Sequence, residues 1–331
     1  MSRRKDTKHS TGTNLRGLAL LLLTLPAMAF SPLLCAQSVK FQKSIDLQKR
    51  GNKKSVASFL LGKKADTGIK PCAVCRLTPG ELCITDSVNG AVVIIDNNGK
   101  VKKTITRVRG LRPASPVSVC TDDRGNFYVA DSSNRVVLKF GNGHKFQKVF
   151  IALPGARITG IVFSTFRDGT FFCTDTPNHR ILCFDREGRL SGTIGARGTG
   201  PVQFNFPTHI AVDDLYLYIT DAMNFRIQVL THAGEFVRAI GSVGRGGGNF
   251  SKPKGLAVDA KRRIYVADAM FDNIQIFDFN GEFLYYFGGP GHKDGEFWMP
   301  ADVMTDNGNQ IWVTDTYNHR LQVFKLSEEA P

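Results

Sequence analysis

Short runs of alternating apolar and polar residues fill most of the chain after residue 70, and polar or glycine-containing turns separate them. Residues 253–288 show the plan, with four such runs at 253–259, 264–267, 274–277 and 282–287. An Asn-Gly pair, the strongest short signal for a hairpin turn, lies between the last two runs. Alternation with a period of two predicts β-strands, and the 3.6-residue period of a helix is absent. This stretch therefore predicts four short antiparallel strands.

The same unit recurs six times, and each copy has a turn that begins with aspartate after its second strand. The six residues are Asp86, Asp131, Asp175, Asp221, Asp268 and Asp315, at intervals of 45, 44, 46, 47 and 47 residues. A constant period of this length indicates a solenoid, a propeller or an array. Because four antiparallel strands make one propeller blade, the sequence predicts an all-β, six-bladed β-propeller.

The residues of this repeated turn invite a catalytic or calcium-binding interpretation. Most copies continue with an asparagine, and three continue with an arginine: Asn89, Asn134, Asn178, Asn224 and Asn318, and Arg180, Arg226 and Arg320. Asp and Asn side chains bond their own backbone in tight turns, and every blade needs this turn. We therefore interpret these residues as structural, and we expect the arginines to pair with carboxylates of a neighbouring blade.

Three of the copies show a longer pattern. A glycine-rich link, Phe, Pro, Gly-Leu-Ala-Val-Asp, Ile-Tyr-Val-Ala-Asp and a segment such as Asn318-His319-Arg320-Leu-Gln-Val-Phe follow in order. This pattern resembles the NHL repeat over residues 71–331, most strongly in the last three copies. The resemblance implies a six-bladed propeller, which agrees with the count of six made from the period.

The last copy ends after its third strand, residues 321–326, so the chain must supply a fourth strand from elsewhere. Without it, the blade would end in an exposed strand edge. Residues 39–47 alternate like the other fourth strands, whereas residues 56–61 also read as a short amphipathic helix. We predict that 39–47 closes the propeller and that a short helix at 56–61 follows.

Residues 1–36 have the features of an export signal. Basic residues lead and an apolar run occupies 18–30, and the cleavage site could be Ala27-Met28-Ala29 or Leu34-Cys35-Ala36. The sequence therefore predicts export to the periplasm or the extracellular space. An uncleaved anchor is the alternative, because 18–36 is just long enough to span a bilayer, and Cys35 leaves a lipoprotein as another.

The net charge of +14 lies mostly outside the predicted propeller. Residues 1–36 carry +4, the segment 37–70 carries +7, and 71–331 carries only +3. Nucleic-acid binding would need the positive charge on the folded domain, among exposed aromatic residues, so we do not expect a nucleic-acid partner. Membrane contact is expected only through 1–36 or the basic segment 37–70, and the propeller is expected to be monomeric.

One ring of positions differs among the copies in a way that suggests chemistry. The third position of each first strand, counted from its opening proline where it has one, should face the central channel. The six residues there are Ala73, Ser118, Gly160, His209, Gly255 and Asp302. Ser118, His209 and Asp302 are the candidate catalytic residues. Because they stand on alternate blades, we expect them to be too far apart for a hydrogen-bonded relay.

A metal is the other interpretation of this ring. His209 and Asp302 could hold zinc or calcium with water completing the site, although we expect no cofactor. Peptidyl-amidating lyases, similar in repeat, hold zinc with several histidines in the channel, and only His209 matches such a position here. Calcium-dependent lactonases use a Glu/Asn/Asp cluster in a different repeat, and this sequence does not show it.

Six cysteines follow Cys35: Cys72, Cys75, Cys83, Cys120, Cys173 and Cys183. Cys72 and Cys75 form a C-x-x-C in a predicted strand, where residues three apart point to opposite faces and cannot form a zinc knuckle. Small buried apolar side chains are the expected role. Export leaves a cross-strand disulfide such as Cys75–Cys83 open.

Together these observations favour an exported propeller that binds a protein or peptide, or acts as a scaffold, in the cell envelope. Loops at one rim would make the contact, with Arg197, Arg245 and the loop 288–297, which includes His292, exposed there. The alternative is a metal-assisted lyase or hydrolase with its site in the channel. Fold alone does not decide between these classes.

Overall fold

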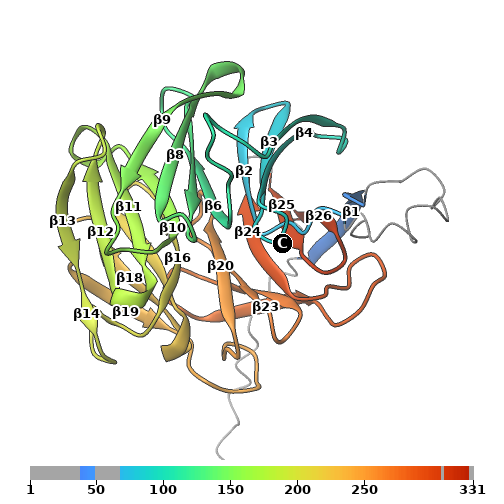
Figure 1. Cartoon of the computed structure of the whole chain (residues 1–331). Helices are drawn as coiled ribbons and strands as arrows, with labels where there is room; N and C mark the ends of the chain where they lie inside the picture. The colour runs from blue at the N-terminus through green and yellow to red at the C-terminus, as the bar shows by residue number, and fades with distance from the viewer. Residues whose placement is uncertain (1–37, 49–67, 307–308, 328–331) are drawn as a thin grey trace, which may run out of the picture.

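The computed structural model describes residues 38–48, 68–306 and 309–327 (Figure 1). Six four-stranded antiparallel sheets stand around a central axis, so the predicted six-bladed propeller is confirmed. The proposed export signal and the helix at 56–61 lie outside the described residues. Within the described ranges, none of the helices has the length and apolar character needed to cross a bilayer.

The first three blades follow the chain, each from its innermost to its outermost strand. Blade one contains β2 (Ala73–Thr78), β3 (Glu81–Asp86), β4 (Ala91–Asp96) and β5 (Val101–Ile105). Blade two contains β6 (Pro116–Thr121), β7 (Phe127–Asp131), β8 (Val136–Gly141) and β9 (Lys145–Ala152). Blade three contains β10 (Ile158–Ser164), β11 (Thr170–Asp175), β12 (Arg180–Asp185) and β13 (Leu190–Ile194).

The last three blades repeat this order. Blade four contains β16 (Pro207–Val212), β17 (Tyr216–Asp221), β18 (Arg226–Thr231) and β19 (Phe236–Ile240). Blade five contains β20 (Pro253–Val258), β21 (Ile264–Asp268), β22 (Asn273–Phe277) and β23 (Phe283–Gly288). Blade six contains β24 (Pro300–Thr305), β25 (Gln310–Asp315), β26 (Arg320–Ser327) and β1 (Ser38–Asp46). Short strands β14 (Ala196–Arg197) and β15 (Gln203–Phe204) pair in the link before blade four.

Strand β1 pairs antiparallel with β26 and lies on the outer edge of blade six, next to the C-terminal end of the described chain (Figure 1). A bulge between Phe41 and Lys43 shifts its register. Val39 and Phe41 therefore pack toward blade five, while Ile45 and Leu47 pack toward blade one. A bulge adds one residue and changes which face the following side chains point to. One strand thus serves two neighbouring interfaces.

The core is divided among the six interfaces between blades. Six clusters of buried apolar residues each combine side chains from two adjacent blades. The aromatic residue three places before the turn aspartate is buried in blades two to six: Tyr128, Phe172, Tyr218, Tyr265 and Trp312. Because each blade buries its faces only against its neighbours, the ring must close to cover all of them.

The repeated aspartate turn fastens each blade to the segment that precedes it. Asp315 is fully buried and accepts hydrogen bonds from the Trp298 backbone N–H at 2.8 Å and from Asn318 Nδ2 at 2.8 Å. Arg320 Nε donates to the same carboxylate at 2.7 Å, and its Nη2 donates to the Glu296 carbonyl at 2.8 Å. One carboxylate therefore joins the turn, its strand and the link before the blade.

The arginines do not pair with a neighbouring blade as the sequence analysis predicted. Arg180, Arg226 and Arg320 bond the aspartates of their own blades, at 3.0, 2.8 and 2.7 Å. The arginine lies five residues after its aspartate, directly opposite it in the antiparallel register. That proximity within the blade favours the local partner.

Replacement of Asp315 by alanine should destabilise the propeller by about 3–5 kcal/mol, the usual cost of removing one partner of a buried ion pair. Urea unfolding followed by tryptophan fluorescence measures the change. Asp294→Ala is the matched control, because Asp294 lies 3.6 Å from the same arginine but its side chain is 60% exposed. Equal stability of the two variants would contradict the role given to Asp315.

Candidate functional site

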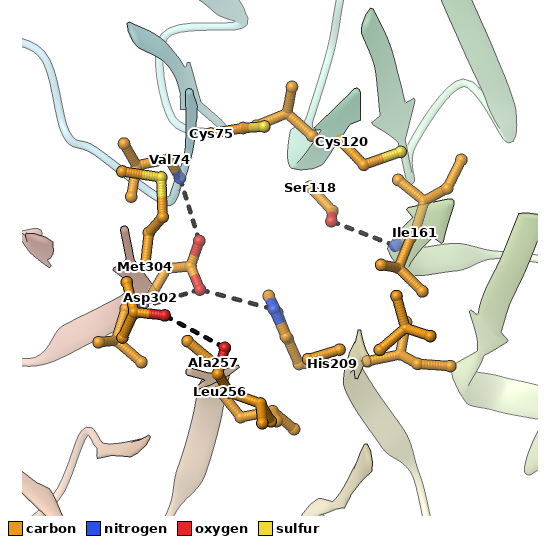
Figure 2. Close-up of a pocket in the computed structure, with 18 of the residues that line it drawn as sticks. Val74, Cys75, Ser118, Cys120, Ile161, His209, Leu256, Ala257, Asp302 and Met304 are labelled. Carbon is orange, nitrogen blue, oxygen red and sulfur yellow. Dashed lines mark hydrogen bonds and ion pairs between the residues drawn. The ribbon is translucent and has the colours of Figure 1, made fainter. Parts of the chain in front are cut away.

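The innermost strands of the six blades contact one another in a ring and enclose a channel with a cavity of about 300 Å³ (Figure 2). Positions in the inner strands are counted here from Pro71, Pro116, Ile158, Pro207, Pro253 and Pro300. The fourth residue of each is buried and apolar: Val74, Val119, Ile161, Ile210, Leu256 and Val303. The third residues include Ser118, His209 and Asp302, and all three line the cavity. Apolar and polar residues therefore both line the channel, and the polar third positions lie at one end of it.

The structure brings two of the three candidate residues together. His209 Nε2 in blade four lies 3.6 Å from Asp302 Oδ1 in blade six, across the intervening blade five. Figure 2 shows the imidazole and the carboxylate pointing toward each other over the channel. This contact is beyond hydrogen-bond length, so the two side chains form a close pair without the hydrogen-bonded relay that the sequence analysis did not expect.

A glycine in blade five makes this approach possible. A Cβ added to Gly255 would lie 2.5 Å from both Cα and Oδ1 of Asp302, and 2.7 Å from the Ala301 carbonyl oxygen. Any other residue would push β20 and β24 apart. Gly255 thus leaves the space over blade five that the His209 and Asp302 side chains use.

Ser118 does not join them. Its Oγ accepts a hydrogen bond from the Ile161 backbone N–H at 3.2 Å, on the next blade. Within the described ranges, no hydrogen bond connects Ser118 with His209. The arrangement is therefore a His–Asp pair with a separate serine, and it lacks the nucleophile–base contact that a catalytic triad needs.

Asp302 is held firmly and is almost completely buried. Its carboxylate accepts the Val74 backbone N–H at 3.0 Å and the Val303 backbone N–H at 2.9 Å. Burial raises the pKa of Asp302, while His209 and these two N–H groups act in the opposite direction. The site therefore consists of one buried carboxyl group with fixed donors and one imidazole at longer range.

A metal ion would find few protein ligands here. Catalytic zinc sites use three protein ligands and leave one position open. Across the residues that the structure describes, no group of three His, Cys, Asp or Glu side chains is placed to hold one ion. His209 and Asp302 offer two, so water would have to supply the rest.

The three rim residues lie in links on the face that carries the aspartate turns. Arg197 and Arg245 are exposed, and His292 is exposed while bonding Asn318 Oδ1 through Nδ1 at 2.6 Å. The His292 ring also packs edge-on against Trp298, with ring centroids 5.2 Å apart. His292 therefore supports a neighbouring aromatic residue.

That face also exposes a set of large apolar side chains, which the sequence analysis missed. They occur two residues after the turn aspartate or shortly before the first strand, and each is 41–60% exposed: Val88, Phe206, Met223, Met270, Trp298 and Tyr317. We call these six residues the apolar arc. They belong to blades four, five, six and one, whereas the equivalent turn positions of blades two and three hold Ser133 and Pro177. Comparing this turn position across the six copies would have revealed it.

Comparison with protein families gives two matches. A model described as NHL repeat matches residues 297–324, and a model described as 6-bladed beta-propeller matches 157–227 and 214–271. The chain is a six-bladed β-propeller, and its sixth blade matches the NHL repeat. The comparison with curated proteins gives no match.

Several solved structures share the fold of this propeller. A catalytically inactive virginiamycin B lyase variant from Staphylococcus aureus, with quinupristin, has a TM-score of 0.58 and 14% identity, covering 87% of this chain and 88% of that one. A gluconolactonase from Xanthomonas campestris has a TM-score of 0.55 and 15% identity, covering 75% and 82%. An auxiliary nutrient binding protein from Bacteroides thetaiotaomicron has a TM-score of 0.64 and 11% identity, covering 88% and 77%. At these identities the likeness shows the fold alone.

The six cysteines in the described part of the propeller are free thiols. Cys75 and Cys83 face each other in the register of β2 and β3, as the disulfide left open by the sequence would require, but they are not joined. Burial raises the pKa of the Cys75 and Cys183 thiols to about 11. It also raises the pKa values of Cys83, Cys120 and Cys173 well above the ordinary range.

We expect these thiols to resist alkylation in the native protein. A thiol with a pKa of about 11 is only about one part in a thousand thiolate near pH 8, and the thiolate is the reactive form. Mass spectrometry after iodoacetamide treatment should show all six thiols unmodified in the folded protein and modified in denaturant without reductant. Protection of Cys75 and Cys83 in denaturant would reveal a disulfide instead.

Proposed function

We propose that this protein is a protein- or peptide-binding module of the cell envelope and that it binds through the face carrying the aspartate turns. The observation that supports the proposal most directly is the apolar arc. Exposed apolar patches rimmed by polar residues are typical of interaction sites. The envelope location rests on the export signal expected in residues 1–36.

The arc is built on a rigid frame. Tyr317 N–H donates to the Trp298 carbonyl at 3.2 Å, and Met223 N–H donates to the Asn205 carbonyl at 3.0 Å. Trp298 N–H is in turn held by the buried Asp315 carboxylate at 2.8 Å. A surface that is already ordered loses less conformational entropy when a partner binds.

Aromatic residues in the arc are suited to act as anchors. The Trp298 and Tyr317 rings pack together with centroids 5.4 Å apart, and Lys70 Nζ lies 5.3 Å from the centre of the Tyr317 ring. Trp and Tyr are enriched among residues that dominate interface energies. Exposed Arg197 and Arg245 add positive charge to the same face, which gives the apolar surface a polar surround.

The test uses a variant with Met270→Ser, Trp298→Ser and Tyr317→Ser together. If these residues anchor the partner, truncation of each costs more than about 1 kcal/mol, so the partner's affinity should fall by more than about a hundredfold. The measurement is a pull-down from cell-envelope extract with wild type and variant, followed by titration of the protein that is recovered.

Leu215→Ser is the matched control. Leu215 is also about half exposed, but it lies in the turn between β16 and β17, at the opposite end of the blade from the aspartate turn. The proposal requires that wild type and Leu215→Ser capture the same protein and that the triple variant does not. Equal capture by all three would place the interaction elsewhere.

A second candidate function, a metal-assisted lyase or hydrolase, is supported by the approach of His209 to Asp302 at 3.6 Å. Virginiamycin B lyase and gluconolactonase are enzymes with similar propellers, which makes the channel a reasonable place for a reaction. His209 and Asp302 would be the two protein ligands of the ion.

Elemental analysis of purified protein separates the two functions. The enzyme hypothesis predicts about one zinc or calcium ion per chain. His209→Ala should lose this ion, because the one remaining protein ligand would bind it only weakly. His292→Ala, which changes an exposed histidine of the rim, should keep the metal. Metal-free wild type after dialysis against zinc and calcium would leave this second function without support.

A further inference from the structure

We propose that the channel is a binding site for a small apolar amine whose ammonium group pairs with the Asp302 carboxylate. This site is separate from the apolar arc, so the proposal does not depend on the protein-binding function. It concerns a ligand, and it requires neither a metal nor a reaction.

The charged groups that line the channel limit which class of ligand can bind there. Among the residues that line the cavity, Asp302 is the one carboxyl group and His209 the one basic group; the others are apolar residues, cysteines, Ser118 and threonines. An anionic ligand would have to enter beside a buried carboxylate, which costs Coulomb energy in a poorly solvated site. A cationic ligand would instead supply the charge that a buried carboxylate needs.

In the His209–Asp302 pair, Asp302 is the residue whose position is fixed. The Val74 and Val303 backbone N–H groups hold its two oxygens at 3.0 and 2.9 Å, and Gly255 lies against its Cα. These donors come from backbone that the sheets keep in place. A ligand therefore meets a carboxylate whose position is set before binding.

His209 is the partner of Asp302 that a ligand could displace. Its contact with Asp302 is 3.6 Å long, which is beyond hydrogen-bond length, and its side chain is 19% exposed. An ammonium group can donate to a carboxylate at about 2.7–2.9 Å, so it would form the stronger contact. Lys254, the residue before Gly255, is not among the residues that line the cavity.

The rest of the cavity suits the body of such a ligand. Half-buried apolar side chains further along the inner strands line the cavity and would contact apolar atoms: Val162, Val212, Val258 and Met304. A volume of about 300 Å³ is at the lower end for ligand pockets and favours a molecule the size of a single aromatic ring. Ser118 Oγ accepts from Ile161 N–H, which leaves its hydroxyl hydrogen to donate to a further polar group of the ligand.

Three probes of similar shape test the charge preference: benzylamine, benzyl alcohol and benzoate, titrated calorimetrically into the full chain near neutral pH. Benzylamine should bind saturably with one site per chain. Benzoate should bind at least about tenfold more weakly, because the Asp302 carboxylate repels it. Equal affinity for the amine and the acid, or no saturable amine binding, would overturn the proposal.

Two variants test the residues. Asp302→Asn removes the charge of the carboxylate with little change in side-chain shape and should weaken benzylamine binding by at least about tenfold. Asp294→Asn changes an exposed carboxylate outside the cavity and should leave the affinity for benzylamine unchanged. His209→Gln should tighten benzylamine binding, since it removes the side chain that competes for the Asp302 carboxylate and leaves both backbone bonds to Asp302 in place. Weaker binding in His209→Gln would overturn the proposal even if Asp302→Asn fails to fold.

Discussion

Close approach of the six inner strands around one axis is the constraint on which the channel depends. β20 and β24 lie so near each other that a Cβ at Gly255 would be 2.5 Å from Asp302 Cα. A side chain at the third position must therefore be small or extend over the next blade. In blades one, three and five the residue is small: Ala73, Gly160 and Gly255. In blades two, four and six the side chain extends over the next blade: Ser118, His209 and Asp302. The alternation of small and polar residues follows from packing, and the polar end of the channel is its consequence.

The aspartate turn imposes a different constraint, and it leaves one position free. The carboxylate, the asparagine three residues later and, in three blades, the arginine after it are all occupied by hydrogen bonds that hold the blade. The side chain two residues after the aspartate points to solvent and makes no contact that the turn needs. It can therefore vary without cost to the fold, which is why blades four, five, six and one can carry Met223, Met270, Tyr317 and Val88 there.

The fold could be read from the sequence because its signals are local and repeated. A period near 46 residues, strand alternation and hairpin glycines identify blades one at a time. Contacts that depend on the geometry of the closed ring could not be predicted from the sequence of one blade. Whether His209 reaches Asp302 depends on how closely β20 and β24 approach each other, which the glycine at position 255 permits. The bulge at Gln42, which makes β1 face both neighbouring blades, likewise leaves no clear mark in an alternating sequence.

The two proposed sites meet at one end of the molecule. His209 and Asp302 are the third residues of their strands, and the register places them next to the aspartate turns: Pro207 pairs with Asp221 and His209 with Thr220. The apolar arc occupies the same face, on blades four, five, six and one. A protein seated on the arc would therefore cover the end of the channel that holds the His–Asp pair. Any coupling between the two sites would be reciprocal, because a partner that changes the affinity of the channel for an amine must be affected by the amine to the same degree.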